Sequence, residues 1–135
     1  MILPLPPDRH AEAVALWRAA GLTRPWNDPD ADLRRAVDGP TSTVLAALED
    51  DRLVGTVMIG HDGHRGWLYY LAVDEGFRRR GVGRALVAAA EARLGAHVPK
   101  TQLMVRGDNA AAVAFWERLG YAVQDTAVLG RFLAP

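Results

Sequence analysis

Three consecutive arginines, Arg78, Arg79 and Arg80, stand directly before Gly81 and Gly83 and an alanine-rich apolar pattern. An apolar run precedes them, so the segment lies at a predicted strand-to-helix junction. A helix N-terminus carries about half a positive charge and several unpaired N–H groups. Glycine lets the backbone approach an anion closely, and arginines add charge-assisted donors. The segment therefore indicates either a phosphate-binding turn or a helix start with solvated arginines, and alone it leaves both open.

This turn differs from three other phosphate-binding motifs. A P-loop ends in Lys-Ser or Lys-Thr, whereas the only lysine, Lys100, is far from any glycine-rich turn. A dinucleotide-binding fingerprint requires a third glycine where Leu86 stands. The glycine-rich loop of protein kinases joins two strands, whereas this one begins a helix. All three classes are excluded.

The turn over residues 61–66, His-Asp-Gly-His-Arg-Gly, holds further candidates for chemistry. Imidazole titrates at about pH 6.5, so His64 is a candidate general base, directly or through water, with Asp62 beside it. A purely structural polar turn is the favoured alternative. No metal site is expected at His61, Asp62 and His64, because three ligands in one turn rarely converge without a distant fourth.

Covalent catalysis lacks a nucleophile. The chain has no cysteine, which excludes disulfides, thiolate metal sites and a cysteine nucleophile. The single serine, Ser42, lies outside any G-x-S-x-G elbow. Any group transfer is therefore expected to proceed directly between the two substrates.

Length and charge place the sequence among globular proteins. Its 135 residues predict one domain over 1–135, and half of them are hydrophobic. The formal net charge is zero, so no nucleic-acid partner is expected. No apolar stretch reaches the roughly 20 residues that span a bilayer, and the proline-broken start does not resemble a signal peptide. We expect no membrane partner and a cytoplasmic location.

Hydrophobic periodicity predicts the elements that position these residues. We expect helices over 7–20, 29–38, 81–94 and 109–119, the second capped by Asp28. We expect strands over 2–5, 43–49, 52–60, 67–73 and 101–105, with final strands about 121–123 and 127–132. Asp50-Asp51 suits a tight hairpin turn. The order predicts an α/β (α+β) fold with a mixed, mostly antiparallel sheet of six to seven strands and about four helices on both faces.

Two motifs resemble signatures of the GNAT superfamily of acyl-CoA-dependent N-acetyltransferases. Residues 78–83 are similar to its R-x-x-G-x-G/A signature. Residues 109–121 are similar to its second signature, with Asn109, Ala112, Phe115, Gly120 and Tyr121 in place. Spacing and element order agree across nearly the whole chain. Segments 24–29 and 62–66 most resemble those of a small bacterial branch, the YpeA-like proteins.

The resemblance implies a GNAT acyltransferase fold and acetyl-CoA (coenzyme A) as the cofactor. The coenzyme A pyrophosphate would bind backbone N–H groups of residues 79–85, and the pantetheine arm would pair along residues 71–73. That strand would splay from the next one, with the thioester in the opening. Asn109 would contact the cofactor arm, or else cap its helix. The implied cofactor-binding residues are Leu71, Ala72, Val73, Arg78, Arg79, Arg80, Gly81, Val82, Gly83, Arg84, Ala85, Asn109, Phe115 and Trp116.

The sequence departs from the superfamily at its catalytic positions. Trp116 stands where the usual acid is a tyrosine, and a packing role is favoured for it. Met104 and Trp67 stand where members carry a glutamate base. The catalytic candidates are therefore His64 and Asp62, with water protonating the thiolate, since thiols ionise at about pH 8.5.

The segment 24–29 falls where the superfamily forms the roof of its acceptor site. Arg24 offers paired donors for a carboxylate, Trp26 an apolar wall, and Arg65 further positive charge. With Asn27, these are the predicted acceptor-binding residues, and the acceptor is expected to carry both an amine and a carboxylate. The alternative is a loop pinned by Trp26 in a satellite core, with Asp28 as a helix cap.

The resulting prediction is an acetyl-CoA-dependent N-acetyltransferase that acts on the primary amine of a small molecule. One alternative is an acyl-CoA-binding regulatory module without turnover. The other is a protein N-acetyltransferase, which would require an open acidic groove for a cationic peptide. Pairing of the final strands with a second copy would give a homodimer, because an uncovered sheet edge is a ready site for pairing.

Overall fold

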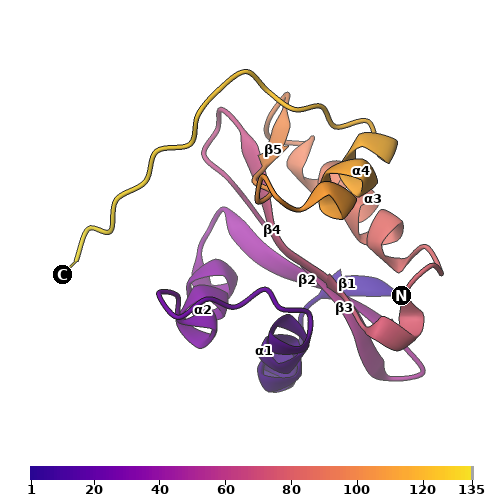
Figure 1. Cartoon of the computed structure of the whole chain (residues 1–135). Helices are drawn as coiled ribbons and strands as arrows, with labels where there is room; N and C mark the ends of the chain where they lie inside the picture. Colours follow the sequence, from indigo (N-terminus) through magenta and orange to yellow (C-terminus); the bar gives the residue numbers. More distant parts are fainter. Residues whose placement is uncertain (135) are drawn as a thin grey trace. The chain divides into compact units, whose positions relative to one another are not determined.

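The computed structural model of the chain describes residues 1–134 and has an α/β fold (Figure 1). The chain divides into two compact units, Met1–Met104 and a second that begins at Val105. The first unit holds a five-stranded sheet in the order β1-β2-β3-β4-β5. Neighbouring strands are antiparallel except β4 and β5, which are parallel. The strands are β1 (Ile2–Pro4), β2 (Ser42–Glu49), β3 (Arg52–His61), β4 (Gly66–Val73) and β5 (Thr101–Leu103).

Residues 1–134 contain four α-helices, the number predicted. The first unit contains α1 (His10–Ala19), α2 (Pro29–Asp38) and α3 (Val82–Leu94), and the second contains α4 (Ala110–Arg118). Short 3-10 turns at Pro7–Arg9 and Glu75–Phe77 precede α1 and α3. Asp28 caps α2 by accepting a hydrogen bond from the Ala31 N–H at 3.1 Å, which confirms the predicted helix start. No helix within residues 1–134 is long and apolar enough to span a membrane.

Helices cover both faces of the sheet in the first unit (Figure 1). Val44 and Ala46 of β2 lie in one buried cluster with Trp17 of α1 and Leu33 of α2. On the opposite face, α3 approaches β3 so closely that a Cβ at Gly55 would meet the Leu86 and Val82 side chains at 2.9 and 3.0 Å. The predicted layer arrangement is therefore confirmed.

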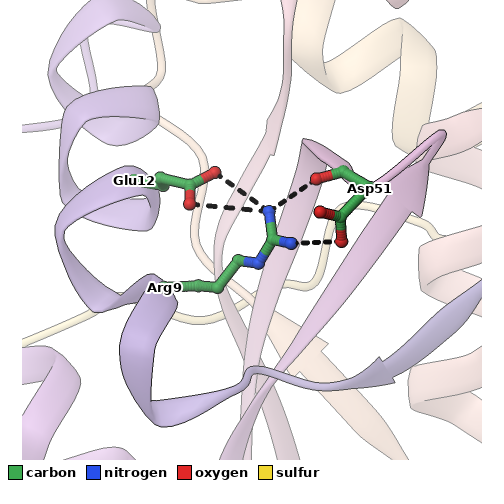
Figure 2. A network of polar contacts seen from close by, with 3 residues as sticks. All are labelled: Arg9, Glu12 and Asp51. Atoms are coloured by element: carbon green, nitrogen blue, oxygen red, sulfur yellow. Dashed lines mark hydrogen bonds and ion pairs between the residues drawn. The ribbon is translucent and has the colours of Figure 1, made fainter.

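The hairpin between β2 and β3 is anchored to the start of α1. Asp50 and Asp51 have φ of +48° and +64°, the left-handed pair that a two-residue type I′ turn requires. Figure 2 shows the Arg9 guanidinium donating to the Asp51 carbonyl at 2.7 Å and to its carboxylate, beside Glu12. This network fixes the edge of the core that α1 shares with the hairpin.

The sheet has slightly fewer strands than predicted. Residues 121–123 and 127–132 form no strand in the described part of the chain, and Val123, Val128 and Leu129 are exposed. An apolar pattern cannot supply the neighbouring strand that a β-strand needs for its hydrogen bonds. β5 also ends at Leu103, before the predicted end at residue 105. That residues 1–135 form one domain stays a prediction.

Candidate active site

The turn that opens α3 has the geometry of an anion cradle. Arg79 and Gly81 have φ of +64° and +81°, and Gly81 is the N-cap. The first helical hydrogen bond runs from the Ala85 N–H to the Gly81 carbonyl at 3.0 Å. The three N–H groups before it, at residues 82–84, therefore have no helical acceptor. Arg78, Arg79 and Arg80 are exposed, and the Arg80 guanidinium lies over the Phe77 ring, 5.0 Å from its centroid.

Strand β4 carries one extra residue opposite β3. Thr56 pairs with Ala72 and Met58 with Tyr69, so the single β3 residue between them faces both Tyr70 and Leu71. Tyr70 has φ of +50°, a conformation that strains a bulky residue by about 1–3 kcal/mol. This bulge breaks the strand's alternation, and Tyr69 and Tyr70 both line one cavity.

Strands β4 and β5 part at the level of the bulge. Their parallel pairing runs from Gly66–Thr101 to Leu68–Leu103, whereas β4 continues to Val73. Within residues 1–134, the β5-facing edge of β4 therefore has no strand partner from Tyr69 onward. On this edge, backbone groups of residues 69–73 are available to an extended ligand, apart from the Tyr70 carbonyl, which accepts a hydrogen bond from the Thr56 hydroxyl. Splaying of the two strands around the thioester stays a prediction.

A cavity of about 590 Å³ lies between α2, β3 and β4. This volume is typical of small-molecule sites. Its mouth includes Tyr69 and Met104, whose side chains are 39% and 52% exposed. All of its lining residues belong to the first unit: Leu22, Asn27, Asp32, Arg35, Ala36, Ser42, Met58, Ile59, Gly60, Tyr69, Tyr70 and Met104.

The cavity contains ionisable groups that the sequence reading missed. The Tyr70 hydroxyl donates to Asp32 Oδ2 at 2.8 Å. Arg35 donates to Asp32 Oδ1 at 2.5 Å, and the arginine side chain is 71% exposed against 24% for the aspartate. Burial, and then the bond to Asp32, raises the pKa of Tyr70 above its ordinary 10.0. Burial also raises the pKa of Tyr69, so both phenols are protonated at neutral pH.

The predicted catalytic pair forms a turn rather than a side-chain dyad. Asp62 Oδ1 accepts hydrogen bonds from the backbone N–H groups of His64 and Arg65, both at 2.8 Å. The bonds from Arg65 and then His64 lower the pKa of Asp62 below its ordinary 3.8. His64 is exposed. Neither predicted catalytic residue lines the cavity, so the structure does not bring them together with Asp32.

The predicted roof residues have separate surroundings. The Arg24 guanidinium donates to the carbonyls of Gly21 and Thr23, each at 2.9 Å, and so braces its own loop. Trp26 is 56% exposed, so it does not pin the loop in a satellite core. Of the four predicted acceptor-binding residues, only Asn27 lines the cavity.

Arg65 also interacts with its own turn, because its guanidinium donates to the His64 carbonyl at 3.0 Å. Together with Arg24, it shows that local backbone contacts take up two of the predicted carboxylate-binding groups. The residue that presents a guanidinium to the cavity is instead Arg35.

The second unit holds the remaining predicted cofactor residues. Asn109 Oδ1 accepts a hydrogen bond from the Ala112 N–H at 3.1 Å and caps α4. Trp116 packs edge-on against Phe115 and Tyr121, with ring centroids 5.3 and 5.1 Å away. The helix-cap and packing roles are therefore present, whereas contacts of Asn109, Phe115 and Trp116 with the cofactor stay predictions.

Known proteins share this fold and much of this sequence. Residues 11–121 match the Acetyltransferase (GNAT) family. An acetyltransferase of Yersinia enterocolitica is 44% identical over 123 residues, which cover 90% of this chain and 87% of that protein. A putative acetyltransferase structure from Agrobacterium tumefaciens has a TM-score of 0.83 at 21% identity, covering 98% of this chain and 99% of that one.

A second solved structure is that of AAC(6')-Iy in complex with the bisubstrate analogue CoA-S-monomethyl-acetylneamine. It has a TM-score of 0.82 at 16% identity and covers 99% of this chain and 98% of its own. The chain therefore shares the fold of both solved structures. The chain belongs to the acetyltransferase (GNAT) family and is an acetyltransferase. Its relatives in Yersinia agree with the bacterial branch that the sequence indicated.

Proposed function

We propose that the chain transfers the acetyl group of acetyl-CoA directly to the primary amine of a small acceptor that also bears a carboxylate. The observation that carries this proposal is the cavity beside the bulge of β4, which contains the Asp32–Arg35 ion pair. Enzymes of the GNAT family use acetyl-CoA. The solved complex of AAC(6')-Iy with a coenzyme A bisubstrate analogue supports this choice of cofactor.

The residues of the first unit fit coenzyme A at two places. The N–H groups of residues 82–84 and the exposed arginines 78–80 would hold its pyrophosphate. The unpaired edge of β4 at residues 69–73 would take the amides of the pantetheine arm as a further strand. Acetyl-CoA supplies an activated acyl group. The proposal also places the protein in the cytoplasm, where acetyl-CoA is made.

In the proposed reaction, the acceptor nitrogen attacks the thioester carbon and the carbon–sulfur bond breaks. Before the attack, the bound ammonium loses one proton to His64 through water, which makes the nitrogen nucleophilic. After the attack, the nitrogen loses a second proton to solvent, and the thiolate takes one from solvent. The Ser42 hydroxyl lines the cavity but donates to the Ala36 carbonyl at 2.8 Å. Ser42 is therefore held as a structural donor, which supports direct transfer over an acyl-enzyme.

The charges of the cavity favour a zwitterionic acceptor. Asp32 and Arg35 are one acid and one base at the same wall, so their formal charges cancel. An acceptor ammonium would lie at Asp32 and its carboxylate at the exposed guanidinium of Arg35. A polyamine, an aminoglycoside or a lysine-rich peptide would require several free carboxylates, which this lining does not offer.

The first test is calorimetric titration of acetyl-CoA into the wild type and into Gly81→Asp. Gly63→Asp is a matched control, because Gly63 also has positive φ, +85°, with no atom within 4 Å of an added Cβ. We expect saturable binding by the wild type and the control, and none by Gly81→Asp. Equal binding by all three proteins would remove the α3 cradle from the proposal.

The second test follows thiol release while acceptors are varied: amino acids, amines without a carboxylate, polyamines, aminoglycosides and peptides. We expect turnover with amino-acid-like acceptors and about a 10-fold higher KM for them in Arg35→Gln. Arg34→Gln is the control, since Arg34 is the adjacent exposed arginine and does not line the cavity. A preference for peptides would instead indicate a protein acetyltransferase. Binding of acetyl-CoA without any turnover would indicate a regulatory module.

A further inference from the structure

A buried polar chain connects helix α1 to the bulge of β4. The Trp17 indole N–H donates to the Thr56 hydroxyl oxygen at 2.8 Å, and both side chains are buried. The Thr56 hydroxyl in turn donates to the backbone carbonyl of Tyr70 at 3.1 Å. Within residues 1–134, Thr56 is the only polar residue of the buried class, with 0% exposure. Burying a hydroxyl is unfavourable unless it is hydrogen-bonded, so Thr56 depends on its two partners, the Trp17 indole and the Tyr70 carbonyl.

The same tyrosine is held at two further points. Its ring stacks on the Trp17 ring, with centroids 3.9 Å apart and an interplanar angle of 14°. Its hydroxyl donates to Asp32 Oδ2 at 2.8 Å. The backbone carbonyl, the ring and the hydroxyl of Tyr70 thus each have a partner, and they come from three different elements: α1, β3 and α2.

We infer that Trp17, Thr56 and Asp32 act as a clamp that holds Tyr70 in its left-handed conformation and so sets the shape of the open β4 edge. This inference rests on the proposed function for its catalytic consequence. A tyrosine at φ of +50° persists only when its surroundings over-determine it. Without the clamp, Tyr70 would leave its left-handed conformation and the bulge would rearrange, so the edge that receives the thioester would move.

Thr56 has the hydrogen-bonding capacity that this clamp requires. A hydroxyl can accept from the indole and donate to the carbonyl at the same time. Valine has nearly the same shape but can do neither, whereas serine keeps the hydroxyl. Trp17 and Thr56 are therefore positioning residues, which act on the reaction through the backbone of β4, whereas Asp32 also contacts the proposed acceptor.

The clamp also connects the two proposed substrate sites. Asp32 lines the acceptor cavity, and its other oxygen takes the Arg35 guanidinium. An ammonium bound at Asp32 would offset part of the negative charge that orients the Tyr70 hydroxyl, and so weaken that hydrogen bond. Acceptor binding and the geometry of the β4 edge are in this way coupled through one carboxylate.

The test compares Thr56→Val, Thr56→Ser and a core control, Val44→Ala. Val44 is fully buried in the same cluster but does not line the cavity. For Thr56→Val we expect kcat to fall by about 10- to 100-fold and the KM for acetyl-CoA to rise, because the edge that pairs with the pantetheine arm moves. Thr56→Ser should recover most of kcat, and Val44→Ala should lose stability without losing kcat. A folded Thr56→Val with wild-type kcat would overturn the clamp.

A second readout decides the inference without any turnover. In the ligand-free protein, backbone amide resonances of residues 69–73 should shift or broaden in Thr56→Val and keep their wild-type values in Thr56→Ser and Val44→Ala. The Trp17 indole proton should exchange faster with solvent in Thr56→Val alone. Unchanged spectra would overturn the clamp, even if the wild type acetylates amines. Changed spectra together with a wild type that acetylates nothing would support the clamp and reject the proposed function.

Discussion

Among single residues, Tyr70 combines strain, burial and a carboxylate partner. Its raised pKa means that the folded protein holds the phenolic proton more tightly than the unfolded chain does. The associated stability is fully present below the unfolded pKa of 10.0 and is lost as pH rises through the higher folded value. We expect the free energy of unfolding to fall above pH 10, and to fall less steeply in Tyr70→Phe. Urea titrations across the alkaline range would measure both slopes, and equal slopes would contradict this linkage.

His64 offers a separate residue-scale prediction about the proton. Its side chain is exposed on a turn that Asp62 fixes through backbone bonds. If His64 receives the acceptor proton through water, His64→Gln should lower kcat/KM at neutral pH by about 10-fold or more and leave acetyl-CoA binding unchanged. Asp62→Asn weakens the turn without removing the imidazole, so it should have a smaller effect. An unchanged kcat/KM in His64→Gln would show that His64 does not receive the acceptor proton.

The residue scale is also where sequence reasoning was weakest. The glycines and arginines of residues 78–83 follow a motif, so their place at the start of α3 could be predicted. Arg24 and Arg35 could not be told apart, because either guanidinium can bind a carboxylate. The difference lies in tertiary geometry: Arg24 folds back on its own loop carbonyls, whereas Arg35 reaches the cavity. The spacing of Asp32 and Arg35 on one helix was the available signal.

At the scale of elements, the contact between α3 and β3 sets the position of the α3 N-terminus. A Cβ at Gly55 would lie 2.9 Å from Leu86 Cδ1 and 3.2 Å from the Ala72 carbonyl oxygen. Gly55→Ala should therefore push the first turns of α3 outward, destabilise the protein by about 1–3 kcal/mol and weaken acetyl-CoA binding. Calorimetric titration and thermal unfolding would measure the two effects.

A control substitution tests whether the steric contacts at Gly55, and not a glycine-to-alanine change in general, cause these two effects. Gly107→Ala, where an added Cβ has nothing within 4 Å, should leave both stability and binding near the wild-type values. A Gly55→Ala protein that binds acetyl-CoA normally would show that α3 can shift without disturbing its N-terminal turn.

Periodicity predicted the helices and the central strands, but not the bulge in β4. The run from Trp67 to Val73 reads as an apolar buried strand, and strict alternation would place Tyr69 and Tyr70 on opposite faces. The extra residue in β4 places both in the cavity instead. A bulge depends on the partner strand and on Thr56 beneath it, and neither is visible in the local pattern.

For the whole molecule, the C-terminal segment carries the main prediction about assembly. Five large apolar side chains there are 70–92% exposed: Val123, Val128, Leu129, Phe132 and Leu133. Exposed apolar groups of this number favour association. We expect a concentration-dependent homodimer in sedimentation experiments, and a monomer after truncation behind Tyr121. A monomeric full-length chain at high concentration would contradict the predicted dimer.

The same segment shows why the strand count was predicted too high. Residues 121–123 and 127–132 have strand-like composition, yet no strand of the described chain pairs with them. Strand propensity reports how well a side chain fits an existing pleated surface, and it cannot create that surface. The predicted mixed sheet is confirmed, because the helix α3 joins β4 and β5 as a crossover and the two strands pair in parallel.

The open edge of β4 has a practical consequence for handling the protein. An unpaired edge in the middle of a sheet invites the backbone of another chain, so the empty enzyme should be prone to slow self-association during expression and storage. A ligand that occupies residues 69–73 would block that route and would also raise the melting temperature by mass action. Coenzyme A added during purification should therefore slow aggregation and extend the time for which the protein stays in solution.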